Sequence, residues 1–175
     1  YEIRQGVAWD NIPFTPQIEE LARHTRAACF GSLAQRSPVS HRTIGRFLET
    51  MPDGEGQYKV FDINLRQHFY TQQVVEESLR KCNILKINDE ELAVIGGMFG
   101  MEGMQPREQC RTLLDRYGLR IVILTCGAAG SSVFAPGTRS YIPTPRVEVA
   151  DTVGAGDSFT ASFLAALLSG LGIGE

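Results

Sequence analysis

The sequence alternates between short apolar, β-branched runs and helix-like patterns, and this order constrains the fold more than any other feature. The strand-like runs are residues 27–33, 58–65, 83–88 and 119–125. The helix-like patterns are residues 40–51, 72–81, 89–95 and 106–117. Because parallel strands need long crossover connections, usually helices, the alternation predicts a mostly parallel α/β sheet. Residues 131–135 and 139–142 flank Pro136-Gly137-Thr138, which predicts an antiparallel β-hairpin towards the C-terminal side.

Length and charge narrow the class of protein. A chain of 175 residues is expected to form one α/β domain, residues 1–175. Its net charge of −3 leaves no basic surplus, so no nucleic-acid partner is expected. The apolar run 159–173 covers 15 residues, fewer than the roughly 20 that span a bilayer, which predicts a buried helix and no membrane association. The chain shows no secretory signal and is expected to be cytoplasmic. It lacks a leading methionine and stops soon after the apolar run, so we expect a fragment that is incomplete at both ends.

Cysteines and histidines are scattered without the spacing of a metal site, so no structural zinc is expected. They are Cys29, Cys82, Cys110 and Cys126, and His24, His41 and His68. The thiols are expected to be reduced and packed in the interior.

Three local patterns give further expectations. Ser40 is expected to cap the helix that carries Ile44 and Leu48 on one face. Residues 96–100, with three glycines, are expected to form a loop. Trp9, beside Asp10, is expected to cover the core rather than to contact a ligand.

Polar residues collect where the predicted strands end. Asp62, Asn64 and Arg66 alternate with apolar residues, so a strand would place all three on one face. Arg66 could then hold phosphate oxygens, although a solvated edge strand would show the same alternation. In open α/β sheets, ligands bind outside the carboxyl ends of the strands.

Two other strand ends carry motifs with an open interpretation. Asn88 and Glu91 have the spacing of a helix capping box, which we favour over a role for Glu91 in ordering magnesium-bound water. Thr125, Gly127 and Gly130 follow the most hydrophobic strand. The two glycines suit either a tight turn or the close approach of a nucleotide. From this local pattern alone, we favour the tight turn.

The segment Asp151-Thr152-Val153-Gly154-Ala155-Gly156-Asp157 precedes the apolar run and combines a glycine-rich turn, an acid and a helix start. Backbone amides there can point towards an anion, and the positive end of the helix favours negative charge. Asp157 is either a simple N-terminal acid or a base placed beside that anion.

These motifs, in this order, resemble the ribokinase-like (pfkB) carbohydrate kinases. The resemblance rests on Asp62-x-Asn64-x-Arg66, Asn88-x-x-Glu91, Thr125-x-Gly127-x-x-Gly130 and above all on the segment 151–157, which is similar to the C-terminal signature of that family. It implies a three-layer α/β/α ribokinase-like fold. Within it, 1–175 would be part of a nucleotide-binding domain that lacks the family's N-terminal substrate and lid portion and its last segment.

The resemblance also implies roles for the residues. Asp157 would be the general base for a sugar hydroxyl, and the amides of Gly154, Ala155 and Gly156 would stabilise the transferring phosphoryl group. Arg66 and Asp157 would contact the sugar. The nucleotide would be bound by Asn64, Arg66, Thr125, Gly127, Gly130, Asn88 and Glu91, with Glu91 also reaching the metal through water.

Cofactors and partners follow from the same likeness. ATP and Mg²⁺ are expected, with K⁺ as an optional monovalent cation, and the intact protein would be a candidate homodimer. The region around Ala8 and 61–66 looks most like fructokinases, so fructose is the first substrate expected. Ribose, adenosine and 2-keto-3-deoxygluconate are the alternatives, as is a non-catalytic nucleotide or sugar sensor on the same fold. Because the family's N-terminal portion is missing, a folded but inactive fragment is a further alternative.

Overall fold

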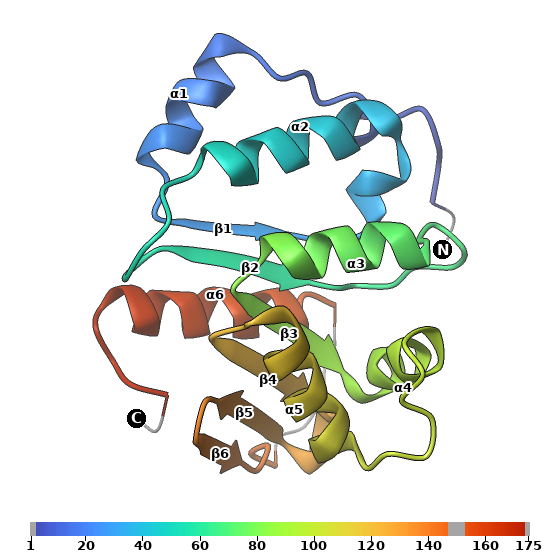
Figure 1. Ribbon diagram of the computed structural model, residues 1–175, viewed down its shortest axis with the longest axis vertical. Helices are drawn as coiled ribbons and strands as arrows, with labels where there is room; N and C mark the ends of the chain where they lie inside the picture. Colours follow the sequence, from blue (N-terminus) through green and yellow to red (C-terminus); the bar gives the residue numbers. More distant parts are fainter. Residues whose placement is uncertain (1–2, 147–152, 174–175) are drawn as a thin grey trace. The chain divides into compact units, whose positions relative to one another are not determined.

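The computed structural model describes residues 3–146 and 153–173, and the chain divides into two compact units, Tyr1–Cys82 and Asn83–Glu175 (Figure 1). The first unit contains η1 (Ala8–Asp10), α1 (Pro16–His24), β1 (Ala27–Phe30), η2 (Leu33–Arg36), α2 (Pro38–Thr50), β2 (Tyr58–Asp62) and α3 (Gln72–Lys81). The second contains β3 (Ile84–Asn88), α4 (Asp89–Met98), α5 (Pro106–Tyr117), β4 (Ile121–Thr125), η3 (Gly127–Ala129), β5 (Ser131–Ala135), β6 (Thr138–Ile142) and α6 (Ala155–Leu168).

The first unit is built on two parallel strands. β1 pairs with β2 from Ala27 opposite Tyr58 to Phe30 opposite Phe61. Adjacent residues Val60 and Phe61 are 1% and 0% exposed, so β2 is buried on both faces. Helices α1 and α2 cover β1 through an apolar cluster centred on Leu48.

Two expectations for this unit are wrong. Helix α2 begins at Pro38, not after Ser40, because proline is well suited to the first helical position. Ser40 instead lies inside the helix, buried, where its hydroxyl accepts the Ile12 amide at 2.9 Å. Trp9 is 44% exposed, because in the short helix η1 the adjacent Asp10 takes the buried position.

The second unit confirms the expected mixture of parallel strands and a hairpin. β3 and β4 are parallel, whereas β4 with β5 and β5 with β6 are antiparallel. β4, the most hydrophobic strand, thus has a neighbour on each side. Helix α5 packs on β4 and β5. It ends at Tyr117, as the pattern 106–117 predicts, and its C-cap residue is Gly118, whose φ of 62° favours glycine.

The glycines at 96–100 are not all in a loop. Helix α4 continues through Gly96 and Gly97 to Met98. A Cβ on Gly96 would lie 2.8 Å from Nε2 of Gln109, so that glycine permits close packing of α5. The apolar run 159–173 is helical as far as Leu168, in α6, but the expectation that this helix is buried is wrong, because Thr160 is its one buried residue. No described helix is long and apolar enough to cross a membrane.

Candidate functional site

The ends of β3 and β4 bring two predicted motifs together. Asn88 and Thr125 are register partners at the ends of adjacent parallel strands. The Asn88 side chain accepts the Glu91 amide at 2.8 Å, and the Glu91 carboxylate accepts the Asn88 amide at 3.0 Å. This confirms the capping box. Since Glu91 is 6% exposed, one function of its carboxylate is to hold the start of α4.

The turn after β4 is tightly held. The Cys126 amide donates to the Gly130 carbonyl at 2.9 Å, and the Gly130 amide to Gly127 at 3.2 Å. The hydroxyls of Tyr141 and Thr144 donate to the carbonyls of Ala129 and Gly127 at 2.7 and 2.6 Å. Gly130 is buried while Gly127 is exposed, so the turn presents its outer backbone to solvent.

The start of α6 has the geometry that an anion site needs. Gly154 is the N-cap residue with φ 77°, a left-handed conformation that favours glycine, and a glycine has no side chain with which to cap the helix. The first backbone amides of a helix have no partner within it. Asp157 is in the first turn and is exposed. Its carboxylate therefore lies near these amides and is accessible to a ligand. Asp151 and Thr152, from the same motif, lie outside the described residues.

Lys86 is a residue of this region that sequence reasoning missed. A Cβ on Gly156 would lie 3.1 Å from Lys86 Nζ, so the ammonium is beside the first turn of α6. Lys86 is 8% exposed and lies two residues before Asn88, on the same face of β3. A buried cation at the positive end of a helix concentrates positive charge there. The available signal in the sequence was a lysine between apolar residues, Leu85 and Ile87, of a predicted strand.

Asn64 and Arg66 belong to the first unit, and their expected geometry is wrong. β2 ends at Asp62, which is 9% exposed, and Asn64 has φ 44°. A left-handed residue breaks the two-residue alternation of a strand, so Asp62, Asn64 and Arg66 do not share one strand face. Arg66 is exposed, and its guanidinium donates to the Leu65 carbonyl at 3.1 Å.

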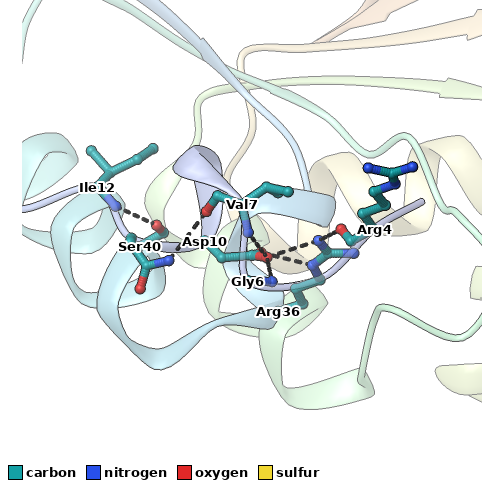
Figure 2. A network of polar contacts seen from close by, with 8 residues as sticks. Arg4, Gly6, Val7, Asp10, Ile12, Arg36 and Ser40 are labelled. Carbon is teal, nitrogen blue, oxygen red and sulfur yellow. Dashed lines mark hydrogen bonds and ion pairs between the residues drawn. The ribbon is translucent and has the colours of Figure 1, made fainter.

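A buried ion pair in the first unit is the second feature that sequence reasoning missed. Figure 2 shows the Asp10 carboxylate between the Arg36 guanidinium and two backbone amides. Arg36 donates from Nε at 2.7 Å and from Nη2 at 2.9 Å, and the Gly6 and Val7 amides donate at 2.8 and 3.3 Å. The hydrogen bonds from Arg36 lower the pKa of Asp10 below its ordinary value. The two residues are 26 positions apart, so no local pattern predicts the pair.

Glu91 is the residue for which a contact to a metal is expected. Among residues 3–146 and 153–173, no group of three or more His, Cys, Asp or Glu could hold a metal ion. Magnesium often binds through one or two carboxylates together with substrate phosphates, so a single Glu91 is compatible with a water-mediated contact. That role stays a prediction.

The cysteines are only partly packed as expected. Cys82 and Cys110 are buried, and burial raises the pKa of each thiol to about 12. Cys126 is half-buried, and burial raises its pKa too. Cys29 is exposed, because it projects from the face of β1 opposite Phe30, which packs on the core.

Known proteins with similar sequences are sugar kinases. A fructokinase from Rhizobium leguminosarum bv. trifolii is 29% identical over 160 residues, which cover 87% of this chain and 46% of the relative. The 2-dehydro-3-deoxygluconokinase of Escherichia coli K12 is 30% identical over 164 residues, with 87% and 50% covered. The chain therefore spans about half the length of the curated relatives it matches.

Solved structures show the same fold. The aminoimidazole riboside kinase from Salmonella enterica matches with a TM-score of 0.69 and 25% identity, over 82% of this chain and 48% of that one. A PfkB protein from Polaromonas sp. JS666 matches with a TM-score of 0.78 and 20% identity, over 97% and 55%. The sequence model of the pfkB family of carbohydrate kinases matches residues 38–175. This chain belongs to the pfkB carbohydrate kinase family.

Proposed function

We propose that the protein containing this chain transfers the γ-phosphoryl group of ATP to a hydroxyl of a sugar. The observation that carries the proposal is the start of α6. There, a helix N-terminus with a glycine N-cap, the buried Lys86 ammonium and the exposed Asp157 carboxylate lie close together. A positive surface beside a base is the arrangement that phosphoryl transfer requires, because catalysis of that reaction is mainly positioning and charge stabilisation.

Each group then has a defined task. The sugar hydroxyl oxygen attacks the γ-phosphorus while the bond from that phosphorus to the bridging oxygen of ADP breaks. Asp157 takes the hydroxyl proton, and the amides of Gly154, Ala155 and Gly156 donate to the phosphoryl oxygens. Lys86 adds positive charge at the same point. Mg²⁺ bound with ATP would neutralise phosphate charge, and Glu91 would be the residue that contacts it through water.

Nucleotide binding is assigned to the ends of the strands in the second unit. The register of Asn88 with Thr125, and the solvent-facing turn from Gly127 to Gly130, support a nucleotide lying across this edge. Arg66 and Asn64, in the loop after β2, are proposed to contact phosphate, and Arg66 also the sugar. K⁺ dependence and a homodimer stay predictions.

Fructose is the first substrate we propose, because two fructokinases are among the relatives. Aminoimidazole riboside and 2-dehydro-3-deoxygluconate are the next, since kinases named for them are similar to this chain. ADP release from the intact protein should be measured with these three compounds, ribose and adenosine. Thermal stabilisation by ATP and sugar without any ADP would instead indicate a non-catalytic sensor.

Asp157→Asn tests the base. We expect turnover to fall by at least about 10²-fold, the usual contribution of a positioned general base, with ATP affinity largely kept. Asp115→Asn is the matched control, because Asp115 is an exposed acid on α5 and should leave turnover unchanged. Wild-type turnover in Asp157→Asn would refute the role of Asp157.

A further inference from the structure

The loop after β2 is strained and is held from one short helix. Both residues with positive φ other than glycine in the described chain, Asn64 at 44° and Gln67 at 48°, are in this loop. Such conformations persist only where the surroundings enforce them, and they cluster at functional sites. Two residues at the two ends of η2 supply that support: Ser32, its N-cap, and Arg36, its last residue.

Ser32 holds the beginning of the loop. Its amide donates to the Ile63 carbonyl at 3.3 Å, and its hydroxyl donates to the Asn64 carbonyl at 3.3 Å. Ser32 is 0% exposed, so these bonds are shielded from water. The strained Asn64 is therefore fixed from the side of η2.

Arg36 holds the end of the loop. Its guanidinium lies over the Phe69 ring, 4.5 Å from the ring centre, and Phe69 is joined to Arg66 by a backbone hydrogen bond of 3.0 Å. The same guanidinium also holds the N-terminal segment through hydrogen bonds. Besides Asp10, Arg36 donates to the Arg4 carbonyl at 2.5 Å (Figure 2).

Arginine is the side chain suited to making both contacts at once. Its planar fork binds the Asp10 carboxylate through two nitrogens while its face stacks on a ring, and the compact ammonium of a lysine cannot do both. The side chains of Arg36 and Asp10 are 8% and 7% exposed. The remaining Arg36 nitrogen, Nη1, is buried and has no hydrogen-bond partner among the described residues. An apolar contact would tie the segments together without burying a charge or leaving this donor unpaired, so stability alone does not explain the pair.

We propose that Arg36 is a positioning residue for ATP binding, which acts by holding the loop 63–69 and tying it to the turn 6–10. The inference rests on the proposed function, in which Asn64 and Arg66 of this loop contact phosphate. Arg36 itself contacts no substrate. Arg36 keeps Arg66 in place through Phe69. The ion pair with Asp10 keeps the Arg36 guanidinium in the required orientation.

Arg36→Lys in the intact protein tests this inference. We expect KM and Kd for ATP to rise about tenfold, within the effect of up to about 10²-fold that misplacement by 1 Å can have. The amides of residues 63–69 should exchange hydrogen faster. Arg46→Lys is the matched control, because Arg46 on α2 also lies over a ring, at 4.0 Å from the ring centre, but that ring belongs to Phe14, which is not part of this loop.

The readouts separate the possible failures. If Arg36→Lys lowers the melting temperature but leaves loop exchange and both ATP constants as in Arg46→Lys, Arg36 is merely structural and the inference is overturned. If the wild-type protein releases no ADP with any sugar, the proposed function fails instead. In that case hydrogen exchange and the ATP Kd still decide the role of Arg36, and unchanged values in Arg36→Lys overturn it.

Discussion

At Gly130, adding a single methyl group is expected to destabilise the fold strongly. Its φ of 103° and ψ of −163° lie in a region that is essentially restricted to glycine. A Cβ there would lie 2.4 Å from the Ile142 carbonyl oxygen and 2.9 Å from the Pro143 Cα. Both neighbours are backbone atoms, so neither can rotate away.

The cost of Gly130→Ala has two parts. The backbone conformation costs roughly 1–3 kcal/mol for a residue with a side chain. Forcing a methyl group into a packed space typically costs about 1–3 kcal/mol more. We therefore expect a loss of about 4 kcal/mol in the free energy of unfolding, which corresponds to about 8–16 °C in melting temperature for a chain of this size.

Gly137→Ala separates these two parts. Gly137, in the turn between β5 and β6, has φ 73°, but a methyl group added there would have nothing within 4 Å. Only the left-handed conformation is penalised, at roughly 1–2 kcal/mol. Urea unfolding of both variants and the wild type measures the difference, expected to be about 2 kcal/mol. If Gly130→Ala is no less stable than Gly137→Ala, the close approach of Gly130 to β6 is refuted.

Two further predictions concern ionisable groups. Because the folded state lowers the pKa of Asp10, its stabilising effect is present above the ordinary value of 3.8 and is lost as pH falls through the lower folded value. Asp10→Asn should flatten the decline of urea midpoints below that pH, and an equally steep decline would contradict the ion pair with Arg36. A thiol reagent should label the exposed Cys29 before Cys82 and Cys110, whose buried thiols have pKa values of about 12. Mass spectrometry of the native protein checks this, and equal labelling rates would contradict the burial.

Local signals predicted several elements closely. The structure confirms the helix from Gln72 to Lys81 and the one from Pro106 to Tyr117. Both have cues that act within a few residues: a Thr71 side chain that caps the first, and Pro106 and Gly118 that bound the second. Helix ends and tight turns are decided by such neighbours, so a single sequence suffices to place them.

Other expectations were wrong where distant residues decide the outcome. The alternation after Asp62 looked like a continuing strand, but hydrogen bonds from Ser32, some 30 residues earlier, hold Asn64 in a left-handed conformation. Gly96 looked like a loop residue, but it stays helical and lets Gln109 approach closely. In both cases the competing interaction joins residues that are adjacent only after folding.

By itself, the sequence determined the α/β class, most element positions, the capping box at Asn88 and Glu91, and the motifs that identified the family. These depend on periodicity and on contacts between near neighbours in the chain. Tertiary structure alone decided that Lys86 lies beside Gly156 and that Arg36 joins Asp10 to Phe69. Such pairs are set by how strands and helices pack, because burial of charge and close backbone approach depend on atoms far away in the sequence.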